Sequence, residues 1–208
     1  MSELNHTQIV REYIDGINIS KPIFLANVKN LVGENAKMIL TRLTRDGLIV
    51  RFEKGIYYKP AKTIWGNSVI GIDNIIKHKY IEDEDGNIKG YITGARLFNH
   101  LGFTTQVPRM TEVVSNECNG KNRIVTDYSV IVRRPKIKVD NDNYLYQQLI
   151  DIVENKTNVY IEAECPAAII KTFYKDNHLD FAALHKIGLM RGISRHTLYE
   201  LSRFILEV

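Results

Sequence analysis

Apolar residues recur at helical spacing in three successive stretches near the start of the chain, residues 5–16, 22–32 and 33–47. Apolar positions three and four apart, with a glycine at the end of each stretch, predict three short amphipathic helices. Pro22 suits the first position of the second helix, because proline lacks only an N–H that is unpaired there anyway. The chain is therefore expected to begin with three helices.

Two short runs of β-branched and aromatic residues follow, LIVRF at 48–52 and GIYYK at 55–59. They predict two strands joined by a tight turn. Three helices followed by a hairpin is the order of a winged helix-turn-helix, in which the second helix of the motif, here residues 35–46, enters the major groove of DNA. The expected DNA-contacting residues are Asn35, Lys37, Met38, Thr41, Arg42 and Arg45 on the helix, and Arg51 and Lys54 on the hairpin.

The distribution of charge supports this interpretation. Residues 1–64 contain ten basic and six acidic side chains, a net charge of +4, whereas residues 65–208 contain eighteen of each. Between residues 21 and 62 the basic excess rises to +6, because nine Lys and Arg face three Asp and Glu. A concentrated basic surface fits DNA phosphates. A protein-docking module and an inert solvated helix face remain the alternatives.

Composition and length define the class of protein. With 208 residues, 44% hydrophobic and 25% charged, the chain has an ordinary globular composition, which excludes disordered, collagen-like and coiled-coil proteins. The length suits one large domain or a small domain joined to a mid-sized one. The shift in charge near Pro60, Trp65 and Gly66 favours a winged-helix domain at 1–64 and a second domain at 65–208.

The second domain is predicted to mix helices and strands, so the fold class is α+β, with a winged helix-turn-helix ahead of a larger mixed domain. Patterning predicts helices at 68–80, 94–101, 143–153 and 166–174, an extended segment at 107–116, strands at 128–139 and 158–162, and a closing helical hairpin at 179–187 and 194–206. Ser194 is expected to cap the last helix.

One block in the second domain, residues 90–116, is more distinctive than the rest. Together with the G-I-Y-Y strand and the I-I-K-H-K-Y segment, its G-Y-I-T-G and L-G-F-T-T-Q-V-P runs resemble the AbiE-type antitoxin family over about residues 5–135. The motif residues are Gly94, Leu101, Gly102, Thr104, Thr105, Gln106 and Pro108. Of these, Thr104, Thr105 and Gln106 can cap a helix, pair across strands or line a recognition groove.

The resemblance implies a DNA-binding autorepressor and antitoxin of a type IV toxin-antitoxin or abortive-infection operon. It further implies that the protein opposes a nucleotidyltransferase-like toxin without forming a stable complex with it. The expected DNA partner is a double-stranded operator, and inverted repeats are expected because two protein copies read two half-sites. The resemblance assigns no catalytic residue.

The sequence lacks the motifs of phosphate-binding loops, dinucleotide sites, zinc proteases and serine hydrolases. Glu162, Glu164 and Lys171 could serve a metal-dependent nuclease, but solvated carboxylates at a strand end explain the first two more simply. We therefore expect no enzyme, no catalytic residue, no metal and no cofactor. The alternatives are a nucleic-acid-processing enzyme or accessory subunit that uses the winged helix to deliver DNA, and a protein-docking adaptor.

The remaining candidate groups favour structural roles. His178, His185 and His196 have no ligand-like spacing, and Cys118 and Cys165 are expected to be reduced thiols. The acidic run 82–87 resembles a calcium loop but has glycine where the bidentate glutamate belongs. A basic string offers a second nucleic-acid surface: Lys121, Arg123, Arg133, Arg134, Lys136 and Lys138. Without a signal sequence or a membrane-length apolar run, the protein is expected in the cytoplasm.

Overall fold

The computed structural model describes residues 3–19, 21–64 and 66–206 and has an α+β fold. The chain divides into two compact units, residues 1–78 and 79–208. The sequence analysis set the boundary earlier, between residues 64 and 65, and Trp65 itself lies outside the described residues. The two units are described separately below.

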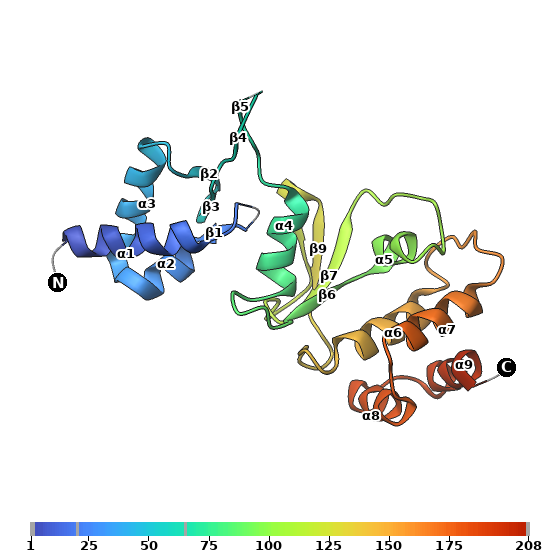
Figure 1. Cartoon of the computed structure of the whole chain (residues 1–208). Helices are drawn as coiled ribbons and strands as arrows, with labels where there is room; N and C mark the ends of the chain where they lie inside the picture. Colours follow the sequence, from blue (N-terminus) through green and yellow to red (C-terminus); the bar gives the residue numbers. More distant parts are fainter. Residues whose placement is uncertain (1–2, 20, 65, 207–208) are drawn as a thin grey trace. The chain divides into compact units, whose positions relative to one another are not determined.

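The first unit packs three helices beside a small antiparallel sheet (Figure 1). Its elements are α1 (Glu3–Gly16), β1 (Ile23–Phe24), α2 (Leu25–Val32), the 3-10 turn η1 (Gly33–Asn35), α3 (Ala36–Arg45), β2 (Val50–Glu53) and β3 (Ile56–Tyr58). The strand order is β1-β3-β2, so that β3 lies in the middle. The predicted helices and hairpin are thus present, with one added strand.

That added strand corrects the predicted start of the second helix. Pro22 is not the first helical residue, because Ile23 and Phe24 pair with Tyr57 and Ile56 of β3. The helix begins only at Leu25, whose N–H donates to the carbonyl of the hairpin glycine at 2.8 Å. Pairing with a distant strand therefore overrides the local helical pattern.

The apolar faces of the three helices meet in one core. Its buried members are Val10, Ile14, Ile23, Val28, Val32, Ala36, Ile39, Leu40, Leu43, Ile49 and Tyr57. Tyr58 points to the other side of the sheet and joins Ile56, Ile70 and Ile75 in a second cluster. This agrees with the alternation of side chains along a strand. The core side of α3 is therefore fixed, and its opposite side faces solvent.

The first unit continues into a second, shorter hairpin and a helix. The hairpin consists of β4 (Lys62–Thr63) and β5 (Gly66–Asn67), and it lies where the sequence analysis placed the domain boundary. The helix predicted at 68–80 begins later, as α4 (Ile72–Ile76), and is followed by a π-helical turn, Lys77–Ile81.

The second unit is built on a four-stranded sheet. Its strands are β6 (Gly90–Thr93), β7 (Thr111–Ser115), β8 (Arg123–Val125) and β9 (Val130–Arg133), in the order β6-β7-β9-β8. The pair β7 and β9 is parallel, and the other pairs are antiparallel. Helix α5 (Gly94–His100) connects β6 to β7, and the 3-10 turn η3 (Thr126–Tyr128) connects β8 to β9.

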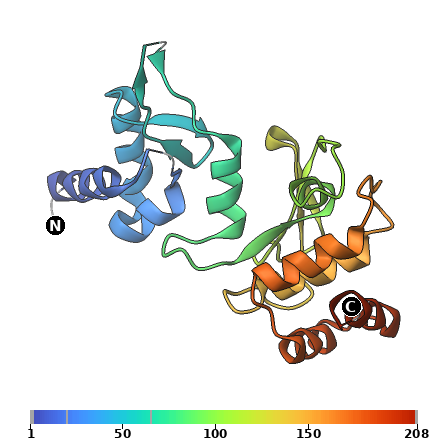
Figure 2. The ribbon, with the colours of Figure 1, turned by 45° about the vertical axis from the view of Figure 1, so that its right-hand side comes forward.

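Four helices complete the unit: α6 (Tyr144–Asn155), α7 (Pro166–Asp176), α8 (Phe181–Arg191) and α9 (Arg195–Leu206). Helix α6 packs on β6 and α5, α7 lies beside it, and α8 and α9 pack against this helical layer on the side away from the sheet (Figures 1 and 2). The cap is confirmed, because the Ser194 hydroxyl accepts the N–H of Thr197 at 3.0 Å.

The predicted strand at 158–162 is wrong. This segment has no regular secondary structure and joins no sheet. The N–H groups of Glu162 and Ala163 both donate to the carbonyl of Phe103, at 2.9 and 3.1 Å. The backbone carbonyl of Phe103, in the loop after α5, therefore holds this segment, and no partner strand does.

No helix in the described ranges is both long and apolar enough to cross a membrane.

Candidate nucleic-acid interface

The exposed side of α3 carries most of the residues that the sequence analysis selected. Lys37, Thr41 and Arg45 follow one another four residues apart, and Met38 and Arg42 form the adjacent row. Residues at this spacing lie on one helix face. All are exposed except Arg42, which is half-buried. Together with Glu34, these five residues line a shallow, open depression.

The acidic residues near this face do not neutralise it. Glu34 is paired with Lys29 of α2 at 3.1 Å. Asp46 lies 3.9 Å from Arg45, whose side chain is 80% exposed, and exposed pairs of this kind contribute about 0 to 1 kcal/mol. The guanidinium of Arg45 is therefore free to reorient toward a phosphate or a base edge.

Asn35 differs from the other selected residues, because it lies in the 3-10 turn before α3. Its side-chain nitrogen donates to Nδ1 of His6 in α1 at 3.0 Å. This hydrogen bond ties the start of α3 to α1. In this position Asn35 sets the direction of α3 and is not displayed on the helix face.

The two residues selected on the hairpin are both exposed. Arg51 lies on β2, where its Nε donates to the carbonyl of Glu53 at 3.2 Å, and Lys54 lies in the turn. The turn is held against α2 through the carbonyl of Gly55. These two cations therefore project from a fixed part of the unit.

The hairpin of β4 and β5 carries further exposed residues that the sequence analysis did not select. Lys62 and Thr63 are exposed, and Ile64 is 91% exposed. The hydroxyl of Thr63 closes the hairpin by donating to the carbonyl of Gly66 at 2.7 Å. In the sequence, Gly66 was the signal that could have predicted this hairpin. Its φ of 109° is one that glycine adopts without strain in a tight turn.

In the second unit, the glycines of the family-like motif have backbone roles. Gly94 has a φ of 65°, and a Cβ there would lie 2.7 Å from the carboxylate of Glu112. Gly102 ends α5 with a φ of 83°. Leu101 packs on the main core of the unit. These positions shape the connection from β6 to β7.

The threonines of the motif hold the extended segment that follows α6. Thr104 is buried, and its hydroxyl accepts the N–H of Gln106 at 3.2 Å. Thr105 donates to Glu162 through both its N–H and its hydroxyl, and these bonds hold the pKa of the Glu162 carboxyl below its usual 4.5. Gln106 is exposed and Pro108 is half-buried.

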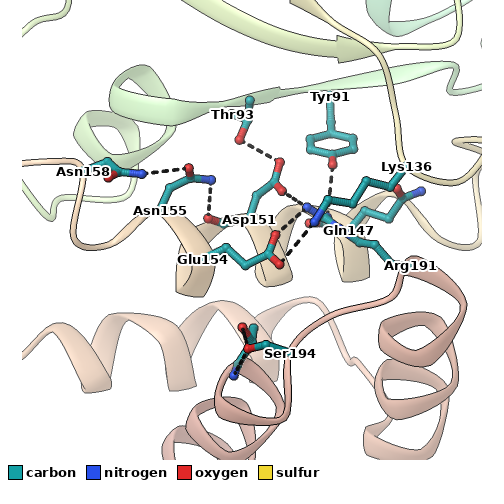
Figure 3. Close-up of polar contacts among 11 residues, drawn as sticks. Tyr91, Thr93, Lys136, Gln147, Asp151, Glu154, Asn155, Asn158, Arg191 and Ser194 are labelled. Atoms are coloured by element: carbon teal, nitrogen blue, oxygen red, sulfur yellow. Dashed lines mark hydrogen bonds and ion pairs between the residues drawn. The ribbon is translucent and has the colours of Figure 1, made fainter.

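A buried charged network in the second unit was not predicted (Figure 3). Arg191 of α8 contacts the carboxylates of Asp151 and Glu154 on α6, and Thr93 of β6 donates to Asp151 at 2.8 Å. Burial and the charge of Asp151 raise the pKa of Tyr91. No spacing in the sequence links these residues, because they come from three separate elements.

The groups considered for other chemistry do not converge. Among the described residues, no group of three or more His, Cys, Asp or Glu is placed to hold a metal ion. Asp83 of the acidic run instead accepts the side chain and N–H of Asn87, which lower its carboxyl pKa, as in an ordinary turn. Cys118 and Cys165 are free thiols.

The chain is thus a two-unit α+β protein whose first unit displays a basic helix face. Residues 12–141 match the model of a family described as "Family of unknown function (DUF6088)", and the chain belongs to this family. The match covers most of the first unit and the sheet of the second, and it ends before α6. No curated protein matches the chain significantly.

Proposed function

We propose that the protein binds double-stranded operator DNA through α3 and represses transcription of its own operon. The observation that carries the proposal is the row of Lys37, Thr41 and Arg45 on a helix whose opposite face is anchored in a core. The order of three helices and hairpin, with sheet order β1-β3-β2, supports a winged helix-turn-helix for this unit.

The chemistry of the displayed residues suits this role. Arginine can donate two hydrogen bonds to a guanine edge, lysine pairs with phosphates, and threonine contacts bases or phosphates. Arg51 and Lys54 on the hairpin add cations that can contact the backbone. The exposed side of α3 can therefore enter the major groove without any change in how its opposite side packs in the core.

A promoter-binding assay tests the DNA-binding proposal. Replacing Arg42 and Arg45 by alanine is expected to cost about 1 to 3 kcal/mol for each residue that makes a bidentate base contact. Arg11→Ala serves as the matched control, because Arg11 is an exposed arginine on α1 of the same unit. Equal affinity of the double variant and the Arg11 variant for the promoter would contradict the assignment of α3.

We further propose that the protein is an antitoxin of the AbiE type, acting without a stable complex on a nucleotidyltransferase-like toxin. The resemblance of the 90–116 block to that family supports this part. Co-expression with the nucleotidyltransferase-like product of an adjacent gene is expected to restore growth, while the two proteins do not co-purify. Growth arrest that persists with the intact chain would refute the antitoxin role.

The two activities can be separated. If neutralisation resides in the second unit, Arg42→Ala with Arg45→Ala should abolish repression and leave growth rescue intact. If the same variant loses both, rescue depends on DNA binding, and the antitoxin effect is transcriptional.

A further inference from the structure

A polar pocket of about 280 Å³ lies in the second unit, between the sheet and α6. Strand register places Tyr91, Thr93, Glu112, Val114 and Arg133 on the same face of the sheet, and all five line the pocket. The backbone run from Arg133 to Lys136, together with Asn122, forms another part of the lining, and Asp151, Glu154 and Arg191 complete it.

The acidic groups of the pocket are already paired. Asp151, whose side chain is 7% exposed, contacts Arg191 and accepts the hydroxyl of Thr93 (Figure 3). Glu154 contacts Arg191 at 2.9 Å and Lys136 at 3.4 Å. Each of these carboxylates has a cation against it, so they present little unbalanced negative charge to a ligand.

The basic groups have donors to spare. The guanidinium of Arg134 is exposed and has no hydrogen-bond or ion-pair partner in the described part of the chain; only its backbone N–H is bonded, to the side-chain oxygen of Asn122 at 3.2 Å. That bond leaves the amide nitrogen of Asn122 as a donor. Lys136 is 52% exposed, and exposed ion pairs are weak enough to exchange partners.

Arg133 gives a second sign of unmet hydrogen bonding. Its Nη2 forms an ion pair with Oε2 of Glu112, but its Nε is buried without a hydrogen-bond partner among the described residues. Nε of Arg191 is in the same state. Because buried polar groups in proteins are nearly always hydrogen-bonded, two unpaired guanidinium nitrogens in one pocket indicate a site that accepts a polar ligand.

We propose that this pocket binds a phosphate group through Arg134, Lys136 and Asn122. Four cations and three carboxylates line it, which leaves a net charge of +1. A guanidinium beside an amide and an ammonium suits the several acceptor oxygens of phosphate. Pro135 stiffens the backbone between the two cations, which limits the entropy lost on binding. The site lies in a different unit from α3 and shares no residue with the proposed DNA contact.

The volume of the pocket limits the size of the ligand that can carry the phosphate. It lies just below the roughly 300 Å³ at which pockets for drug-sized ligands begin. It can therefore hold a mononucleotide, or one phosphate of a single strand whose remainder lies outside. The same phosphate-binding groups would serve a mononucleotide and a single strand.

Titration of the isotope-labelled full chain, followed by amide chemical shifts, tests the proposal. The probes are inorganic phosphate, adenosine monophosphate and a four-nucleotide single strand. At least one is expected to bind saturably and to shift the amides of Asn122, Arg134 and Thr93. Stronger binding of the monophosphate identifies a nucleotide site, and stronger binding of the single strand identifies a strand site.

Variants at the pocket mouth decide whether the site is specific. Arg134→Ala and Lys136→Ala should each weaken binding by roughly tenfold, because each removes a charge-assisted hydrogen bond to the phosphate. Arg195→Ala is the matched control, because Arg195 is an exposed arginine at the start of α9 that does not line the pocket. The proposal is overturned if none of the probes binds saturably, if the pocket amides do not shift, or if Arg195→Ala weakens binding as much as Arg134→Ala.

Discussion

Thr105 and Glu162 lie 57 residues apart in the sequence and are joined by two hydrogen bonds to one carboxylate oxygen. The N–H of Thr105 donates at 2.6 Å and its hydroxyl at 2.7 Å. Next to this contact, the carbonyl of Phe103 accepts the N–H groups of Glu162 and Ala163. The T-T-Q-V-P run therefore attaches the segment between α6 and α7 to the end of α5.

This attachment should depend on pH. Both bonds favour the charged carboxylate, so the pKa of Glu162 is lower in the folded protein than in the unfolded chain. Its stabilising effect is full above the usual pKa of 4.5 and is lost as the pH falls through the lowered value. Glu162→Gln should thus lower the melting temperature at pH 7 and make little difference at the acid end of the range.

The control for that prediction is Glu164→Gln, since Glu164 is an exposed glutamate two residues further along the same segment. Thermal unfolding at pH 7 and at several values below 4.5 measures both variants. Equal melting temperatures for the Glu162 variant and the wild type at every pH would show that the contact contributes nothing to stability.

Gly94 and Gly102 offer a matched comparison of two left-handed glycines. An alanine at either position adopts an unfavourable positive φ, at about 1 to 2 kcal/mol. At Gly94 the new Cβ also meets the Glu112 carboxylate at 2.7 Å, whereas at Gly102 it meets nothing within 4 Å. Chemical denaturation should therefore show a larger loss of stability for Gly94→Ala. An equal loss would mean that Glu112 moves aside without cost.

The basic face of α3 is an example of what the sequence can predict. Lys37, Thr41 and Arg45 are four residues apart, and the interleaved apolar positions Ala36, Leu40 and Leu43 determine which face of the helix is buried. Periodicity within ten residues contains all the information needed. The three helices and the hairpin of β2 and β3 follow in the same way, from local patterns and glycine stops.

What the sequence could not supply depends on contacts between distant segments. Ile23 and Phe24 form a strand because β3 lies beside them, although their own pattern fits a helix. The segment at 158–162 has strand-like residues but has no strand to pair with. Arg191 meets Asp151 only because α8 packs on α6, and no spacing rule connects them.

The ion pair of Arg191 and Asp151 should be costly to break from one side only. Both side chains are less than 8% exposed, and Arg191 also donates to the carbonyl of Gln147 at 2.8 Å. Removing one partner leaves a buried charge unpaired, so Arg191→Leu should lower the free energy of unfolding by about 3 to 5 kcal/mol.

Replacing Asp151 by asparagine in the same chain should recover part of that loss, because the remaining buried charge is then removed. Arg203→Ala is the control, since its pair with Glu200 is longer, at 3.7 Å, and its side chain is 44% exposed. Urea unfolding measures Arg191→Leu and Asp151→Asn singly, the double variant and the control. A double variant whose loss equals the sum of the single losses would indicate that the two residues act independently.

The last prediction concerns the electrostatic part of DNA binding. Binding to DNA releases counterions from the phosphates that the protein neutralises, so the logarithm of the binding constant should fall linearly with the logarithm of the salt concentration. Lys37 is an exposed cation at the start of the α3 face. If it contacts one phosphate, Lys37→Ala should reduce the magnitude of the slope by about 0.9 and weaken binding similarly for operator and unrelated DNA.

Arg11→Ala on α1 should leave the slope unchanged. The slopes can be measured by fluorescence anisotropy between 50 and 200 mM salt, over which the salt concentration changes about fourfold. A slope near zero for the wild type would instead favour a protein-docking role for the helix face.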